Sequence, residues 1–354
     1  MESASIPADK PARRSRDIVA DFISKYGLIA LLLLMPIAYG ISDLQSDGDL
    51  SRIATNIKDG LSNGAIWALI AVGYTLVYGI IELINFAHGD VFMIGSFVSF
   101  GFFGTIGLTL TTGPAGLVFG LLITLILAMV TCGALNVMIE RVAYRPLRNA
   151  PKLAPLITAV GFSFILQNVG LLWLGGQHRS VPDLIQSQDR LFEILGVSVT
   201  QGDVLAIAVT APLVILLVGF ITRSRIGKAM RATAQDPDAA RLMGINVDTT
   251  ISFTFLLGGM MAGAAGLIYA LYQTDVWFFS GFTAGLIAFT AAVMGGIGNL
   301  QGAVLGGLII GVIQQISDNR IGTAWTPAIV FAFLVLILVL RPQGLLGEQT
   351  REAG

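Results

Sequence analysis

The longest polar segment inside this chain is RSRIGKAMRATAQDPDAARLMGINVD, residues Arg223–Asp248. Apolar runs long enough to cross a bilayer flank it on both sides, at Val204–Ile221 and at Thr250–Tyr272. A polar segment between two such runs predicts a membrane protein with a loop that lies in water. Because the two spans fix the ends of the loop, we expect it to contact a partner.

The loop carries the start and stop signals of a short helix. Asp236 can accept backbone N–H hydrogen bonds as an N-cap, and Pro237 suits the first helical position. Gly244 suits the position just past the last turn. The sequence therefore predicts a short, well-capped helix between Asp236 and Gly244.

The composition of the whole chain is that of an integral membrane protein. Hydrophobic residues fill 55% of the 354 positions and charged residues only 12%, whereas soluble domains carry roughly 25% charge. The formal net charge of -1 gives no basic face for nucleic acid. One cysteine, Cys132, and two distant histidines, His88 and His178, predict neither an internal disulfide nor a metal site.

Apolar segments recur along the chain, with polar stretches between them. We therefore predict an all-α integral membrane protein with about ten membrane segments, one of them broken or re-entrant. The apolar segments lie at Tyr26–Ile41, Ile57–Leu83, Val91–Leu110, Ala115–Ile139, Leu153–Leu174, Val204–Ile221, Thr250–Tyr272, Ala284–Ile316 and Pro327–Leu340.

Basic residues gather on one side of this arrangement: in the leader before Tyr26, in the loop after Ile139, and in Arg223–Asp248. Since basic loops stay in the cytoplasm, both termini are predicted to be cytoplasmic, with an extension at 1–25 and a tail at 346–354. We expect residues 26–42 to form an additional N-terminal span. A removed signal peptide is the alternative, although the polar leader is long and no A-x-A-like site follows.

Polar residues interrupt the apolar sequence at INFAHGDVFMIGSF, where Asn85, His88 and Asp90 stand close together. Polar groups at membrane depth are costly unless protein or water surrounds them. One interpretation is a re-entrant bend or a lining of a transport path. The other is a cytoplasmic turn in which Asp90 caps a helix. In the fifth span, Gln167 and Asn168 are interpreted as interhelical hydrogen-bonding residues rather than ligands.

A second interruption, GGIGNLQG at residues 295–302, divides the apolar run Ala284–Ile316. The two halves, of about fourteen residues each, are too short for a ~20-residue crossing. We therefore expect a broken or re-entrant pair of helices beside a pathway. The alternatives are one long glycine-rich helix or a loop that returns to the surface.

Two other classes of membrane protein lack support in the sequence. Ion-coupled carriers use ionisable groups near the membrane centre, but Glu82, Asp90 and Asp275 all lie at span ends. For an enzyme, His88 with Asp90 could act as an acid/base pair, yet no nucleophile motif accompanies them. The P-loop pattern GxxxxGK[ST] is also missing, so ATP, if it drives the protein, must be hydrolysed by another subunit.

Four motifs of this chain are specific enough to compare with known families. They are GLSNGAIWALIAVGYTLVYGIIELINFAHGDVFMIGSF from Gly60, IERVAYRPLRNAPKLAPLITAVGFSFILQN from Ile139, RATAQDPDAARLMGIN from Arg231 and AFTAAVMGGIGNLQGAVLGGLIIG from Ala288. In this order they resemble the LivH-type permease subunits of high-affinity branched-chain amino acid ABC importers. The resemblance spans about Thr55–Gly347 and predicts a permease domain at 55–345 with the type II importer fold.

The resemblance implies a non-enzymatic translocation subunit of the bacterial inner membrane, surrounded by lipid and without a cofactor of its own. Its implied partners are a second similar permease, two cytoplasmic ATPases that bind the ATP, and a periplasmic substrate-binding protein. The implied ATPase-coupling element is the loop 223–248, at residues that match the family motif: Arg231, Ala234, Asp236, Pro237, Ala240 and Gly244. Candidate polar residues of the translocation path are Asn85, His88, Asn299 and Gln301.

Two departures from the family pattern concern the substrate. The family commonly has HGE where this chain has His88, Gly89 and Asp90, and it often has a lysine where this chain has Ile287. Related permeases carry urea and short amides, and the core motifs scarcely separate them. A urea or short-amide permease is therefore the alternative within the class, and an ion-coupled secondary transporter is the alternative outside it.

Overall fold

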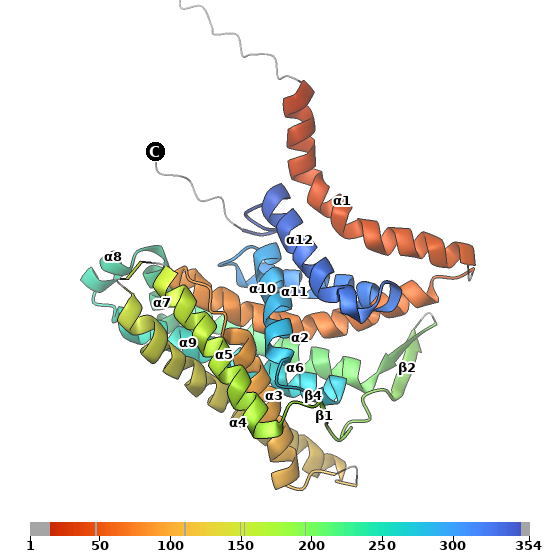
Figure 1. Cartoon of the computed structure of the whole chain (residues 1–354), viewed down its shortest axis with the longest axis horizontal. Coiled ribbons are helices and arrows are strands. Elements are labelled where there is room, and N and C mark those ends of the chain that lie inside the picture. Colours follow the sequence, from red (N-terminus) through yellow and green to blue (C-terminus); the bar gives the residue numbers. More distant parts are fainter. Residues whose placement is uncertain are drawn as a thin grey trace, which may run out of the picture.

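The computed structural model describes residues 15–347 except 47, 110, 149, 152 and 195, and this part of the chain is almost entirely helical (Figure 1). The α-helices are α1 (Ser15–Ser46), α2 (Ser51–Ile81), α3 (His88–Thr105), α4 (Pro114–Ile139), α5 (Leu153–Leu174), α6 (Gln201–Arg223), α7 (Arg225–Gln235), α8 (Pro237–Leu242), α9 (Val247–Gln273), α10 (Ser280–Gly295), α11 (Leu300–Arg320) and α12 (Thr326–Leu340).

Short elements complete the fold. The π-helical turn η1 (Glu140–Tyr144) and the 3₁₀ turn η2 (Arg145–Leu147) follow α4, and η3 (Thr323–Trp325) precedes α12. Strands β1 (Arg179–Ser180) and β4 (Asp275–Val276) pair antiparallel, as do β2 (Arg190–Ile194) and β3 (Val197–Thr200).

Seven helical segments of the described part are long and apolar enough to cross a membrane, among them Ser51–Ile81 and Val247–Gln273. Helix α10, with 16 residues, is shorter. These observations agree with a multi-pass helical membrane protein. The finer count of about ten segments stays a prediction.

The helices run between two ends of the molecule. At the end that we call the α8 end, an ion pair joins Arg145, after α4, to Asp248 at the start of α9. At the opposite end, the sheet end, Lys58 near the start of α2 pairs with Asp203 at the start of α6. Strand β3 leads directly into α6 at this end, and its Thr200 caps that helix.

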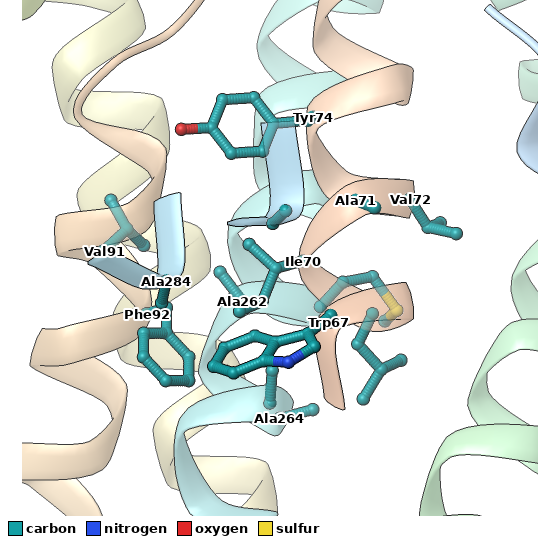
Figure 2. Packing of buried hydrophobic residues seen from close by; sticks show 14 of the residues in the cluster. Trp67, Ile70, Ala71, Val72, Tyr74, Val91, Phe92, Ala262, Ala264 and Ala284 are labelled. Carbon is teal, nitrogen blue, oxygen red and sulfur yellow. The ribbon is translucent and has the colours of Figure 1, made fainter. Parts of the chain in front are cut away.

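Helices α2 and α9 form the centre of the bundle. Their most apolar stretches are 78% and 72% buried, whereas that of α6 is only 22% buried. Figure 2 shows the packed centre, where Trp67 and Tyr74 of α2 lie near Phe92 of α3 and Ala262 of α9. Because lipid tails are as apolar as these side chains, close packing rather than water exclusion must hold the helices together.

Glycines allow α2 and α11 to pack backbone against backbone. An ideal Cβ built on Gly311 would lie 2.3 Å from the Gly60 carbonyl oxygen and 2.4 Å from Gly64 Cα. One built on Gly307 would lie 2.5 Å from Ala68 Cα. The glycine-rich composition therefore has a direct use as the contact between these two helices.

The broken region predicted around GGIGNLQG is present, with one correction. Helix α10 has 16 residues but α11 has 21, so only the first half is short. The halves pack against one another and meet at a turn where Gly296 and Gly298 have φ of 104° and 94°. The prediction of two equal short halves was wrong because the helix restarts within the motif, at Leu300, and runs on to Arg320.

Helix α1 includes the residues expected to form the additional N-terminal span and begins earlier, at Ser15. The buried Asp43 carboxylate pairs with Arg320 at the end of α11, and the Arg320 guanidinium lies 5.4 Å from the centroid of the Tyr39 ring. This pair attaches α1 to the C-terminal helices. Residues 1–14 of the expected extension and 348–354 of the expected tail lie outside the described residues.

Gly311→Ala should destabilise the protein, because the new methyl group would meet backbone atoms of α2 that cannot move independently. Overpacking of this kind costs about 1–3 kcal/mol. The control is Gly161→Ala in α5, where nothing lies within 4 Å of the added Cβ; it should be neutral or stabilise by up to about 1 kcal/mol. Thermal unfolding of the two purified variants in detergent compares them, and equal unfolding temperatures would refute the tight α2–α11 contact.

Candidate functional site

Helix α8 forms the predicted short helix in the polar loop, with both of its predicted caps. The Asp236 side chain accepts hydrogen bonds from the backbone N–H groups of Asp238 and Ala239, each at 2.9 Å. Pro237 is the first helical residue, and Gly244 follows the helix with φ of 82°. A helix this short is marginal by itself, so the caps fix its ends and hold it as a defined element.

Large apolar side chains are exposed at the C-terminal end of α8. Ala240 is buried and holds the helix against the bundle, whereas Ala234, Asp236 and Pro237 are exposed. Leu242 and Met243 have 89% and 83% of their surface exposed. Neither residue was predicted as a site residue, although the sequence shows two adjacent large apolar residues in the polar loop.

Arg231 has a different position from the other residues predicted for coupling. Its guanidinium donates to the carbonyl oxygen of Ile221, and to that of Thr222 at 3.4 Å. These are carbonyls of the last turn of α6, which lack helical partners. Arg231 therefore fastens α7 to α6, and α7 connects that junction to α8.

The break between α2 and α3 is a second polar site. It is exposed at Glu82 and Phe86 but buries Asn85. Asn85 Nδ2 donates to Asn136 Oδ1 at 3.1 Å, and Asn136 Nδ2 donates to the Phe255 carbonyl at 2.7 Å. A simple surface turn does not describe this segment, because its polar side chain is bonded into α4 and α9.

His88 lies deep in the bundle. An ideal Cβ on Gly73 would lie 2.5 Å from His88 Nε2 and 2.9 Å from the Gly258 carbonyl oxygen, so the imidazole lies close to Gly258 of α9. Gly258 stands about 17 Å along a helix about 40 Å long, at ~1.5 Å per residue. Helix α3 therefore starts near the middle of the bundle rather than at its surface.

The His88 imidazole is fully buried and its ring edge faces Tyr74, with 4.7 Å between the ring centroids. The backbone of Ile70 comes near the ring, but neither ring nitrogen meets hydrogen-bond geometry with any described residue. Buried polar atoms usually have partners. Even if the Ile70 backbone bonds one ring nitrogen, the other has no hydrogen-bond partner among the described residues.

Asp90 stands in the first turn of α3 and is buried inside the bundle, so the expectation that it lies at the membrane end of a span was wrong. Its Oδ2 accepts from Ser163 Oγ at 2.5 Å, and Gln167 Nε2 donates to the same hydroxyl at 3.1 Å. Gln167 therefore donates to Ser163 of its own helix, and Ser163 makes the link to α3. Asn168 donates to the Phe164 carbonyl of its own helix, and among the described residues it makes no interhelical bond, so its predicted interhelical role was wrong. Ala87, the N-cap residue, gives no side-chain cap.

A small apolar hollow is lined in part by Tyr74, the residue whose ring contacts His88. Its lining residues come from α2, the α2–α3 break, α10 and the turn before α11: Tyr74, Tyr78, Ile84, Phe289, Ala292 and Ile297. The α2–α3 break and the GGIGNLQG turn, the two interruptions found in the sequence, therefore both contribute to the lining of this hollow. Gly79 and Gly298 also approach one another there, since a Cβ on Gly79 would lie 3.6 Å from Gly298 Cα.

Asn299 and Gln301 do not join Asn85 in its hydrogen-bond network. The Asn299 side chain caps α11 by accepting from the Gly302 N–H at 2.9 Å, and it donates to the Leu346 carbonyl at 2.8 Å. Gln301 lines a larger groove together with residues of α4, α6 and α9 such as Leu213 and Met261. Within the described residues, no cluster of three or more His, Cys, Asp or Glu side chains could hold a metal ion.

Residues 56–340 match the family described as the branched-chain amino acid transport system permease component. The chain is 41% identical to the high-affinity branched-chain amino acid transport system permease protein LivH of Escherichia coli K12, over 82% of this chain and 94% of the relative. It is 40% identical to the corresponding protein BraD of Pseudomonas aeruginosa, over 82% and 95%.

A probable branched-chain amino acid transport permease protein LivH of Methanocaldococcus jannaschii is 27% identical over 79% of this chain and 88% of the relative. The match to the family begins after α1 and includes the α2–α3 break, helix α8 and the broken pair α10–α11. This chain belongs to the family of permease components of branched-chain amino acid transport systems.

Proposed function

We propose that this chain is the translocation subunit of an ATP-driven importer that moves branched-chain, or other small apolar, amino acids across the bacterial inner membrane. The observation that carries the proposal is a short helix, α8, which is capped at both ends and has Leu242 and Met243 exposed at its end. The family membership favours this function over a urea permease or an ion-coupled carrier.

In this proposal the α8 end faces the cytoplasm, together with both termini, and the sheet end faces the periplasm. Two cytoplasmic ATPases bind and hydrolyse the ATP, so this chain needs no cofactor of its own. A periplasmic binding protein delivers the substrate, and a second similar permease completes the membrane part. The basic residues of the loop 223–248 support this orientation, because such loops remain cytoplasmic.

Coupling takes place at α8. The exposed Leu242 and Met243 side chains insert into an apolar groove of an ATPase, since large exposed apolar residues gain most from such burial. Asp236 and Gly244 keep the helix ends formed, Pro237 fixes its first turn, and Ala240 holds it against the bundle. Ala234 lies on the exposed approach to α8, and Arg231 anchors the preceding α7 to α6.

The translocation path passes the α2–α3 break. Asn85 and His88 are its polar residues, and the unused hydrogen-bonding capacity of the imidazole supports that role. The hollow lined by Tyr74 and Phe289 gives this part of the path apolar walls. Asn299 and Gln301 belong to the cytoplasmic end of the path, where Asn299 also caps α11. In alternating access, the cytoplasmic end and the periplasmic end of the path open in turn.

Replacing both cap residues of α8, in Asp236→Ala with Gly244→Val, should abolish ATP hydrolysis stimulated by the binding protein. The first change removes two N–H acceptors, and the second places a branched residue at positive φ. The measurement is stimulated ATPase activity of the assembled importer in vesicles. Wild-type stimulation by a correctly inserted double variant would rule out α8 as the coupling element.

His88→Ala should lower substrate uptake about tenfold, as expected for the loss of one polar contact of about 1–1.5 kcal/mol. Stimulated ATP hydrolysis should persist, because α8 is untouched. Uptake into vesicles and ATP hydrolysis are measured on the same preparation. Asn168→Ala, which removes only a hydrogen bond within α5, is the matched control. Unchanged uptake by a folded His88→Ala importer would remove His88 from the path.

A further inference from the structure

An ion-pair network ties the helix that follows α8 to the end of α4. Helix α9 begins three residues after Gly244, with Asn246 as its N-cap. Asp248 stands in its first turn, where its Oδ2 accepts from Arg145 Nη2 at 2.8 Å and its Oδ1 accepts from Arg148. Any displacement of α8 therefore reaches Asp248 within a few residues.

Arg148 also pairs with Glu140, a carboxylate with no exposed surface. Glu140 Oε2 accepts in addition from Ser252 Oγ at 2.7 Å. Since Asp248 and Ser252 are four residues apart, they lie on the same face of α9. The end of α4 is thus joined to α9 at two successive turns, once through an ion pair and once through a hydroxyl.

The Arg148–Glu140 pair is more costly to break than the contacts of the arginines with Asp248. Glu140 is buried, so leaving its charge without Arg148 would be costly. Asp248 has 44% of its side chain exposed, so water can replace its arginine partners at little cost. Arg148 therefore stays with Glu140, while the contact to Asp248 is the part that can open and close.

The segment that carries these arginines reaches the α2–α3 break. Glu140 begins the π-helical turn η1, and Tyr144 ends it. The single proton of the Tyr144 hydroxyl is shared between two acceptors, the Ile84 carbonyl at 3.2 Å and Asn85 Oδ1 at 3.3 Å. The Tyr144 ring packs on Phe255 of α9. π-Helical turns are rare and concentrate at functional sites. At this turn the Glu140 carboxylate contacts Ser252 of α9, and the Tyr144 phenol contacts the α2–α3 break.

We propose that Asp248, Arg145 and Arg148 form a clamp that transmits movement of α8 to the α2–α3 break through η1. The inference rests on the proposed function, because it takes α8 as the element that an ATPase moves. The three residues are positioning residues, since they touch neither substrate nor ATP. With the clamp closed, the start of α9, η1 and the break move as one unit; with Asp248 released from its arginines, α8 and the start of α9 move without η1 and the break.

The test uses Asp248→Asn in the complete importer, with its ATPases and binding protein, reconstituted in vesicles. This change keeps the side-chain shape but removes the charge that holds Arg145 and Arg148, and it leaves the Arg148–Glu140 pair in place. We expect stimulated ATP hydrolysis to stay within about twofold of wild type and import to fall about tenfold, the effect of ~1.4 kcal/mol. The ATP consumed per imported molecule then rises at least about fivefold.

Two matched variants make the result specific. Asp238→Asn removes an acidic residue of α8 whose partner is Arg241 in the same helix, at 2.7 Å, and it should leave ATP consumed per molecule unchanged. Asp248→Glu keeps the charge and should restore tight coupling. A purely structural role of Asp248 would lower the amount of folded importer without changing the ratio.

Three outcomes contradict the clamp. If Asp248→Asn leaves the ATP consumed per imported molecule unchanged, coupling does not pass through this residue. Loss of stimulated ATP hydrolysis together with import would place Asp248 in ATPase docking instead. An elevated ratio in Asp238→Asn as well would assign the effect to loop charge in general. If the α8 double variant keeps wild-type stimulation, the proposed function itself fails, whatever Asp248→Asn does.

Discussion

Unpaired backbone groups are the constraint that governs this molecule, because lipid offers no hydrogen bonds to a helix that stops inside a membrane. Two breaks occur in the bundle, and protein groups serve both. At the α2–α3 break, Tyr144 donates to the Ile84 carbonyl. At the turn between α10 and α11, the backbone N–H groups of Leu345 and Leu346 donate to the carbonyls of Met294 and Gly295 at 2.7 and 2.9 Å. Each break is therefore held by a segment distant in sequence.

The same constraint explains why polar and glycine positions occur together. A helix that starts or ends within the bundle needs neighbours close enough to bond its backbone, and glycine permits that approach. Gly89 is an example: an ideal Cβ there would lie 2.3 Å from the Gly281 carbonyl oxygen, where the first turns of α3 and α10 meet. The centre of the bundle is closely packed at such contacts, whereas the start of α9 is held by partly exposed charges.

Features encoded by neighbouring residues could be predicted from the sequence. The caps of α8 depend on Asp236, Pro237 and Gly244 alone, and their prediction is confirmed. The helical membrane class follows from composition, and the break at GGIGNLQG from its glycines.

Features that depend on partners far along the chain could not be predicted. The depth of His88 results from its packing on α2 beside α9, and the exposure of Leu242 depends on how the loop lies on the bundle. The roles of Arg231 and Arg148 likewise come from carbonyls and carboxylates that no local pattern marks. The residues proposed for the path stay a prediction.

The pairing of Asp43 with Arg320 has a consequence for biosynthesis. The two residues are 277 positions apart, and at 5–20 residues per second a ribosome needs about 14–55 s to synthesise the interval. During that time the chain between the two residues is still being made, so Asp43 lacks the cation that neutralises it. The contact of α1 with the end of α11 can therefore form only late in synthesis, when most of the family-specific part of the chain has been made.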